Sequence, residues 1–276
     1  MKTLENVQLV SLATNIPGPV AVHRLQQMGA AVAKVEPPAG DLLATAAPEW
    51  YRELHQGITV VQLDLKTSRG MYGLREMLAT ADVLVTSMRP SALKRLGLDW
   101  TNLHDRYPKL CQIAIVGFPE PEREQAGHDL CYQAAFGLVE PDLMPRALVA
   151  DIGGAERTVS AVLGALYLRA TQHVARYQEV SLSEAAGSFA LPYRHGLTAT
   201  TGVLGGGFPG YNLYRASDGW LALAALEPHF WQRVQDGLGV DNPTSGELAH
   251  LFSLKGVEAW QKWAADLDIP LTIVNA

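Results

Sequence analysis

The chain has 276 residues, of which 48% are hydrophobic and 18% are charged, and its formal net charge at pH 7 is −6. These proportions are typical of a globular protein and exclude a disordered or low-complexity chain. The acidic balance gives no sign of a nucleic-acid-binding surface. The two cysteines, Cys111 and Cys131, are too few for a disulfide framework or, alone, for a four-ligand zinc site, which favours a reducing compartment.

The N-terminal stretch has one lysine and then acidic and amide residues within its first apolar run, so it predicts a strand rather than a signal peptide. No window holds about 18 uninterrupted apolar residues, the length that a membrane span needs. The histidines lack the spacing of metal ligands, and no metal site is implied. We therefore expect a cytoplasmic protein that binds neither nucleic acid nor membrane.

The first half of the chain alternates short apolar runs with helical patterns. Strands are predicted over residues 6–13, 30–36, 60–66, 81–88 and 110–118. Helices are predicted over residues 19–28, 68–80, 91–107 and 154–171. Strand–helix–strand units form right-handed crossovers, so the sequence predicts an α/β fold with a Rossmann-like, mostly parallel sheet flanked by helices.

The composition changes after about residue 195. Residues 198–214 are rich in glycine and threonine and are expected to form a linker or loop. Two strand-like runs then flank Asp218-Gly219, the strongest hairpin signal in the chain, and two amphipathic helices follow. We therefore expect a large domain over residues 1–195, and a linker with a small α+β domain over residues 196–276.

The sequence contains no P-loop, nucleophile-elbow, zincin or dinucleotide-binding glycine motif, which weighs against the enzyme classes that use them. Three places remain that could carry chemistry. His128 follows a predicted strand and a polar loop, Asp151 opens the long predicted helix, and Glu227 precedes Pro228 after the hairpin.

Each of these residues has a structural and a functional interpretation. Ligands of open α/β sheets bind beyond the carboxyl ends of the strands, so His128 is either placed for proton transfer or is a surface loop residue. Asp151 is either a helix cap or lies beside amides that polarise a carbonyl oxygen, and Gly153 and Gly154 would let a ligand approach the backbone. Glu227 is either a first-turn residue favoured by the helix dipole or part of a site.

Six segments, in order from residue 15 to about residue 231, resemble the family III CoA-transferase fold family, which includes the α-methylacyl-CoA racemases. They are NIPGPVAVHRLQQMGAAVAKVEPPAGD, QLDLKTSRG, ADVLVTSMRPSALKRLGLDW, GHDLCYQAAFGL, ADIGGAERTVSAVLGALYLR and YNLYRASDGWLALAALEPHFW. One such segment would be a weak signal, but six in family order are specific. The resemblance implies the family III CoA-transferase fold, with a Rossmann-like domain and a second, smaller domain.

The resemblance also implies roles for individual residues. Asp151 matches the nucleophilic aspartate of the transferases, which in the racemases pairs with a histidine, here His128, as a two-base proton shuttle. Glu227 matches a glutamate of the racemase site and would orient His128. Transferases more often have an aromatic residue where His128 stands, so His128 and Glu227 favour the racemase branch.

Further residues are expected to contact coenzyme A, which enters as part of an acyl-CoA substrate and not as a permanently bound cofactor. They are Arg89, Lys34, Gly153, Gly154, Gly205, Gly206 and Gly207. The resemblance also implies an interlaced homodimer. Three departures from the family pattern stand out: no basic residue lies between Arg52 and Lys66, QHVAR replaces the family's glycine turn before the strand YQEVSL, and the family's segment that returns to the large domain is expected to have no counterpart.

Three functions follow as hypotheses. The first is racemisation or epimerisation of 2-methylacyl-CoA thioesters, with one base on each face of the α-carbon and with the amides at the start of the Asp151 helix receiving the enolate oxygen. The second is CoA transfer between an acyl-CoA and a carboxylate through an aspartyl-CoA intermediate. The third is an acyl-CoA-binding protein that has lost catalysis.

Overall fold

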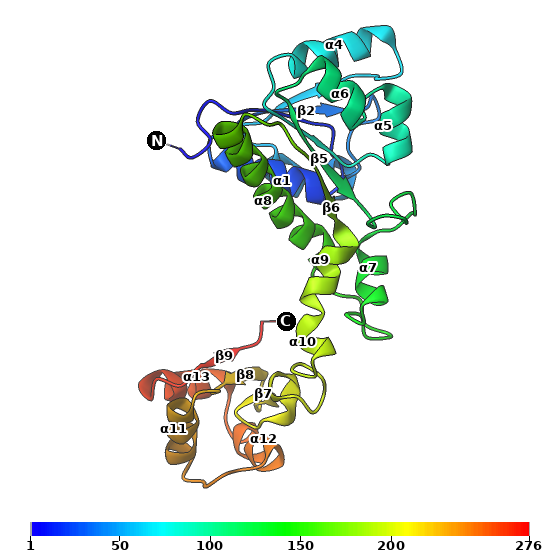
Figure 1. The fold of residues 1–276 in the computed structure, drawn as a ribbon. Coiled ribbons are helices and arrows are strands. Elements are labelled where there is room, and N and C mark those ends of the chain that lie inside the picture. The colour runs from blue at the N-terminus through cyan, green and yellow to red at the C-terminus, as the bar shows by residue number, and fades with distance from the viewer. Residues whose placement is uncertain (1, 276) are drawn as a thin grey trace. The chain divides into compact units, whose positions relative to one another are not determined.

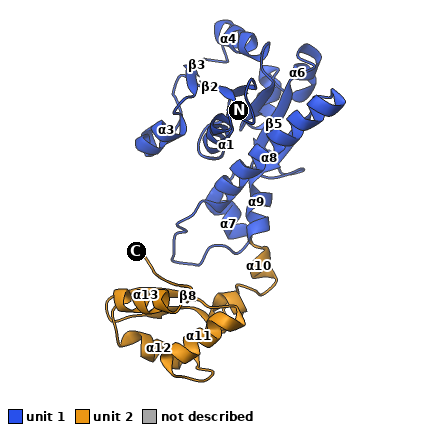
Figure 2. Cartoon of the chain, turned by 90° about the vertical axis from the view of Figure 1, so that its left-hand side faces the viewer, with its two compact units in different colours: residues 1–189 blue, residues 190–276 orange. Residues whose placement is uncertain are grey.

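The structure is a computed structural model that describes residues 2–275, and the chain forms two compact units, residues 1–189 and residues 190–276 (Figure 1, Figure 2). The boundary expected from the sequence, after residue 195, lies a few residues further along the chain. Each unit has its own hydrophobic core.

Unit 1 is built on a six-stranded sheet in which every neighbouring pair of strands is parallel. Its strands are β1 (Gln8–Ser11), β2 (Ala31–Glu36), β3 (Thr59–Gln62), β4 (Val83–Thr86), β5 (Cys111–Val116) and β6 (Tyr177–Ser181). Their order in the sheet is β3-β2-β1-β4-β5-β6. Strands β2 and β3 are added on one side of β1, and β4, β5 and β6 on the other, so the strand order reverses between the neighbours β1 and β4. The predicted Rossmann-like parallel sheet is confirmed.

Helices cover both faces of this sheet (Figure 1). They are α1 (Pro17–Gln27), α2 (Leu43–Ala46), α3 (Pro48–Leu54), α4 (Ser68–Leu78), α5 (Pro90–Leu96), α6 (Trp100–Arg106), α7 (Asp129–Ala135), α8 (Val149–Gln172) and α9 (Leu182–Phe189). Successive strand residues point to opposite faces. Leu9 therefore packs in the core with α1 and α8, whereas Val10 packs in the core with α4, α5 and α6.

The single helix predicted over residues 91–107 is two helices in the structure. Gly97 ends α5 with a φ of +66°, a left-handed conformation that glycine adopts without a steric penalty. Asp99 then caps α6, because its side chain accepts a hydrogen bond from the Asn102 amide. The long helix α8 also begins earlier than predicted, at Val149 rather than at residue 154.

Gly153 and Gly154 lie buried where α8 crosses α9. A Cβ atom on Gly153 would lie 2.4 Å from the Phe189 ring, and one on Gly154 would lie 2.2 Å from Leu182 Cδ2. This contact corrects the prediction that the two glycines let a ligand approach the backbone, because the group that approaches them is α9.

Unit 2 is a small α+β unit whose helices pack on a three-stranded antiparallel sheet. Its elements are α10 (Leu191–Arg194), a wide helical turn η1 (Val203–Gly207), β7 (Tyr211–Arg215), β8 (Trp220–Ala224), α11 (Pro228–Leu238), α12 (Ser245–Ser253), α13 (Val257–Asp266) and β9 (Leu271–Ile273). The predicted hairpin is β7–β8. Helix α12, which the sequence analysis missed, begins with a capping box between Thr244 and Glu247.

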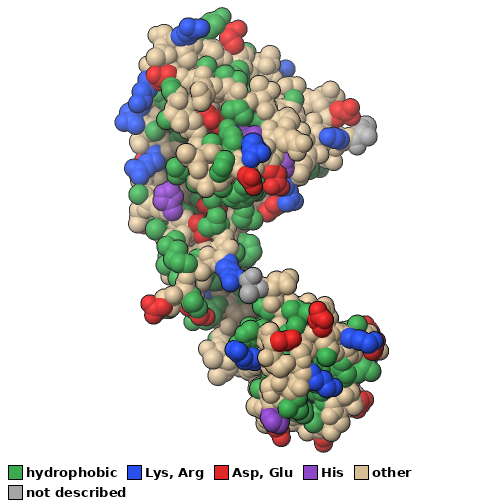
Figure 3. Space-filling model, turned by 180° about the vertical axis from the view of Figure 1, so that it is seen from behind, with side chains coloured by type: hydrophobic (Ala, Val, Ile, Leu, Met, Phe, Trp, Pro, Cys, Tyr) green, Lys and Arg blue, Asp and Glu red, His purple; other side chains and the backbone are tan. Residues whose placement is uncertain are grey.

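Among residues 2–275, no helix combines the length and the apolar character that crossing a bilayer requires. No group of three or more His, Cys, Asp or Glu side chains within the same residues is arranged to hold a metal ion. On the face that Figure 3 shows, acidic and basic side chains are scattered over both units.

The packing of α8 on α9 predicts opposite effects for one substitution at two positions of α8. Gly154→Ala should lower the free energy of unfolding by about 1–3 kcal/mol, because the added methyl group overlaps Leu182. Gly164→Ala is the matched control: Gly164 has no atom within 4 Å of a Cβ, so the change should stabilise by about 0.5–1 kcal/mol. Urea denaturation measures both, and equal effects at the two positions would contradict the assigned contact.

Candidate active site

Two cavities open at the carboxyl ends of the parallel strands in unit 1, the edge at which open α/β sheets bind ligands. The larger has a volume of about 770 Å³ and the smaller about 250 Å³. Thr14, after β1, and Met88, after β4, line both cavities, so the two adjoin at the point where the strand order reverses.

The turn between β1 and α1 forms the wall at this junction, and Asn15 there adopts a left-handed φ of +67°. Three consecutive amides of the turn donate to side-chain oxygens: Ala13 to Ser11 at 3.2 Å, Thr14 to Ser87 at 3.1 Å and Asn15 to Asp41 at 3.1 Å. These amides are therefore engaged within the protein. In dinucleotide-binding folds, the corresponding turn offers its amides to a pyrophosphate instead.

The smaller cavity brings together three residues predicted from the sequence: Arg89, His128 and Asp151. Arg89 precedes α5, His128 precedes α7, and Asp151 lies in the first turn of α8. The side chains of Arg89 and His128 are exposed, whereas Asp151 is partly buried. A basic group, an imidazole and a carboxyl group from three segments thus share one cavity.

Asp129, which the sequence analysis did not single out, caps α8. Its Oδ1 accepts hydrogen bonds from the amides of Ala150 at 2.8 Å and Asp151 at 3.0 Å, and its Oδ2 accepts one from Gln133. The interpretation of Asp151 as a helix cap is therefore wrong. The expectation that an enolate oxygen is received here is also wrong for the amides of Ala150 and Asp151, because these two already donate to Asp129.

The Asp151 carboxyl group has an unusual electrostatic environment. No hydrogen bond to its oxygens is found among the residues that the structure describes. Burial, followed by the nearby charge of Asp129, raises the pKa of Asp151 to about 7. Near neutral pH this group is divided between a carboxylate that can accept a proton and an acid that can donate one.

Tyr132 places a hydroxyl group in the same cavity. Its side chain is 2% exposed, and its oxygen lies in a space that two glycines leave free: a Cβ on Gly117 would be 2.4 Å from it, and a Cβ on Gly127 would be 2.9 Å from it. Burial, and then the charge of Asp151, raises the pKa of Tyr132 to about 12, so the hydroxyl remains protonated. Within residues 2–275, this hydroxyl has no hydrogen-bond partner.

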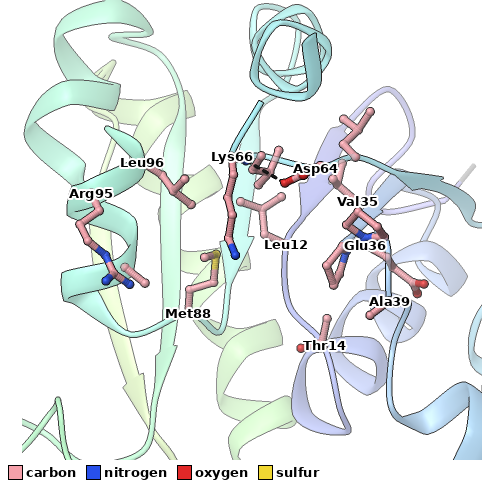
Figure 4. A pocket seen from close by; sticks show the side chains of 15 residues that line it. Leu12, Thr14, Val35, Glu36, Ala39, Asp64, Lys66, Met88, Arg95 and Leu96 are labelled. Atoms are coloured by element: carbon pink, nitrogen blue, oxygen red, sulfur yellow. Dashed lines mark hydrogen bonds between the residues drawn. The ribbon is translucent and has the colours of Figure 1, made fainter. Parts of the chain in front are cut away.

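The larger cavity has mostly apolar walls, two cationic side chains, Lys66 and Arg95, and two acidic ones, Glu36 and Asp64 (Figure 4). The Lys66 side chain extends between Leu12 and Met88, and its backbone amide is fixed by Asp64 Oδ1 at 3.0 Å (Figure 4). Neither cation forms an ion pair with any residue that the structure describes. The cavity therefore suits a ligand with an apolar or aromatic body and anionic groups.

Lys34 is fully buried beneath this edge of the sheet. Its ammonium group lies 2.6 Å from Asp41 Oδ2, 2.9 Å from Glu36 Oε1 and 2.9 Å from His55 Nε2. This burial corrects the prediction that Lys34 contacts CoA, because the ammonium group is 0% exposed and is enclosed by protein acceptors.

The other predicted site residues belong to unit 2. Glu227 is exposed and immediately precedes α11 without making a side-chain cap. Gly205, Gly206 and Gly207 belong to the wide turn η1, in which Gly206 has a φ of +94°. Their contribution to the site, like the interlaced homodimer, stays a prediction.

The sequence analysis missed Tyr132, Lys66 and Arg95, which line the two cavities, and Asp129, which caps α8. Asp129 directly follows His128, and Tyr132 lies one helical turn further along, so the spacing of the GHDLCY segment is a signal that could have found both. Lys66 follows β3 and Arg95 lies on α5, and isolated basic residues at such positions look the same in the sequence as surface residues.

The sequence is similar to one protein family over nearly its whole length. Residues 4–275 match the sequence model described as CoA-transferase family III. The chain is 32% identical to an alpha-methylacyl-CoA racemase of Mus musculus, over 87% of this chain and 65% of the relative. It is 29% identical to a cinnamoyl-CoA:phenyllactate CoA-transferase of Clostridium sporogenes, over 98% of this chain and 77% of the relative.

Solved structures agree at the level of the fold. A crystal structure of a hypothetical protein from Mycobacterium tuberculosis matches with a TM-score of 0.86 and 22% identity, over 100% of this chain and 86% of that one. A CaiB/BaiF family protein from Brucella suis matches with a TM-score of 0.84 and 23% identity, over 100% of this chain and 84% of that one. The chain belongs to CoA-transferase family III.

Proposed function

We propose that this protein acts on acyl-CoA thioesters and that its reaction is racemisation or epimerisation of a 2-methylacyl-CoA by two-base proton transfer. The observation that carries the proposal is that His128 and Asp151 line one cavity of about 250 Å³. The similarity to a mammalian alpha-methylacyl-CoA racemase supports the same reaction class.

CoA would enter through the larger cavity. Its adenosine fits the apolar walls, and its phosphates would pair with Lys66 and Arg95, the two cations at that cavity. The pantetheine arm would pass Thr14 and Met88, which line both cavities, and would carry the thioester to His128 and Asp151.

The α-hydrogen of a thioester is weakly acidic, so its removal needs a base together with a stabiliser for the enolate oxygen. The neutral imidazole of His128 removes the proton from one face of the α-carbon and becomes imidazolium. Protonated Asp151 returns a proton to the opposite face and becomes a carboxylate. For the other enantiomer, the two groups exchange roles, and the pKa of about 7 for Asp151 suits both directions.

Tyr132 is the group best placed to stabilise the enolate. The amides at the start of α8 donate to Asp129 and are not free for this task. The Tyr132 hydroxyl is protonated and lies in the cavity with Asp151. A phenol donor in a water-poor site strengthens its hydrogen bond as charge develops on the substrate oxygen.

CoA transfer is the second candidate, supported by the transferase relative that aligns with 98% of this chain. In that reaction, the Asp151 carboxylate attacks the thioester carbonyl and releases CoA thiolate, which then attacks the mixed anhydride to give aspartyl-CoA and the free acid. A pKa of about 7 leaves part of Asp151 protonated and non-nucleophilic near neutral pH, which favours the racemase.

Deuterium exchange tests the proposed reaction. With 2-methylacyl-CoA substrates in heavy water, the protein should incorporate deuterium at the α-carbon, and His128→Ala and Asp151→Asn should each lower the rate by about 100-fold or more. Mass spectrometry measures the exchange. Hydroxylamine trapping of Asp151 without exchange would favour CoA transfer, and tight CoA binding with neither outcome would identify a binding protein.

Removal of the Tyr132 hydroxyl should affect the chemical step selectively. Tyr132→Phe should lower the exchange rate constant by about 100-fold, the typical cost of one oxyanion donor, while the KM changes little. Tyr72→Phe, an exposed tyrosine on α4, is the control and should behave as wild type. An unchanged exchange rate in Tyr132→Phe would show that another group stabilises the enolate.

The raised pKa of Asp151 predicts a pH-dependent effect on stability. The unfolded chain loses this proton near pH 3.9 and the folded protein near pH 7, so wild type loses stability as the pH rises between these values. Asp151→Asn should therefore be more stable than wild type at about pH 8, and the difference should vanish near pH 4. Urea denaturation at both pH values tests this, with the exposed Asp105→Asn as control; a pH-independent difference would contradict the shift.

A further inference from the structure

Four ionisable side chains form a closed cluster behind the β1–α1 turn. Lys34 and Glu36 lie on β2, Asp41 follows β2, and His55 follows α3. Their exposed fractions are 0%, 3%, 2% and 9%, respectively. The mechanism proposed above uses none of them, although buried charges are costly unless they are paired.

Every member of the cluster has a defined partner. The Lys34 ammonium contacts Asp41, Glu36 and His55, and the Tyr51 hydroxyl donates to Glu36 Oε1 at 2.8 Å. An ammonium group can only donate, so His55 Nε2 is the acceptor. His55 Nδ1 therefore carries the hydrogen and donates to the Tyr51 carbonyl at 2.6 Å, which makes His55 neutral.

The cluster reaches both cavities. Asp41 Oδ1 accepts hydrogen bonds from the amides of Asn15 at 3.1 Å and Leu43 at 3.0 Å, and Asn15 lines the smaller cavity. Glu36 lines the larger cavity. Asn15 holds a left-handed φ of +67°, which an unrestrained loop would leave readily.

We propose that the Lys34–Glu36–Asp41–His55 cluster is a positioning device that fixes the β1–α1 turn between the two cavities, and that it does so only while His55 is neutral. His55 accepts a hydrogen bond from Lys34, Lys34 holds the Asp41 carboxylate, and Asp41 accepts a hydrogen bond from the Asn15 amide. These are positioning residues, since none of them contacts the reacting atoms. The consequence for CoA binding rests on the proposed function, whereas the restraint on the turn does not.

Protonation of His55 would direct an N–H of the imidazolium at the Lys34 ammonium, so two donors and two positive charges would face each other. The groups around His55 are Lys34 and Glu36 from β2, Asp41 from the following loop and Tyr51 from α3, and His23 of α1 bonds the neighbouring Leu54 carbonyl. Burial is the largest cause that lowers the pKa of His55 below its usual value, and Lys34 lowers it further. The cluster is therefore intact at neutral pH and opens only at a pH below the ordinary titration range of a histidine.

Hydrogen exchange of the ligand-free protein tests the restraint directly. His55→Leu removes the acceptor for Lys34 and touches Asn15 only through the cluster, so the Asn15 amide should exchange about tenfold faster or more. His55→Gln retains an acceptor oxygen and should exchange like wild type. Glu49→Gln, on the helix α3 that precedes His55 and with a 92% exposed side chain, is the matched control. Unchanged Asn15 exchange in folded His55→Leu would overturn the proposal.

The pH dependence of CoA affinity is a second test. If His55 served only for packing, its replacement would not change how the affinity depends on pH. We expect calorimetry to give equal dissociation constants for wild type and His55→Gln at about pH 7.5, and about tenfold weaker binding by wild type once the pH is low enough to protonate His55. Taking the ratio of the two proteins cancels the titration of Asp151 and of the CoA phosphates. A ratio that stays constant would overturn the proposal. If wild type binds no CoA at any pH, the proposed function fails, and the Asn15 exchange alone decides the role of the cluster.

Discussion

The hydrogen bonds that Asp129 accepts from the first turn of α8 are the constraint on which the site depends. They fix where the helix begins, and they place a second carboxylate beside Asp151. The same side chain therefore sets the position of Asp151 and, after burial, is the second cause of its raised pKa. The amides of Ala150 and Asp151 already donate to Asp129, so the proposed enolate needs another hydrogen-bond donor. The Tyr132 hydroxyl lies in the same cavity as Asp151 and is such a donor.

The fold explains why residues so distant in sequence meet. Parallel strands end at one edge, so the segments after β1, β4 and β5 converge where the strand order reverses. In dinucleotide-binding proteins, the first of these segments holds a phosphate with its amides. Here those amides bind Ser11, Ser87 and Asp41. The turn thus acts as a fixed partition between a large apolar cavity and a small polar one.

Local sequence signals predicted β1 to β5 of unit 1, placed His128 after a strand and placed Asp151 at the start of the long helix, because apolar runs and motif order are local properties. The cap of α8 could not be predicted in this way, since the hydrogen bond from the Ala150 amide to Asp129 spans 21 residues. Lys34 was misassigned for a similar reason: a lysine in a strand looks like a surface cation until its distant partners are known. Gly154 looked like a ligand contact, but only the position of α9 reveals its packing role.

The titration of Asp151 tests the central claim most directly, because both its position and its chemistry depend on Asp129. Carboxyl carbon NMR of the protein, with Asp151→Asn used to assign the resonance, gives its midpoint. The account predicts a midpoint near 7 in wild type and a clearly lower one in Asp129→Asn, where the neighbouring charge is removed. A wild-type midpoint near 4, unchanged in Asp129→Asn, would contradict it.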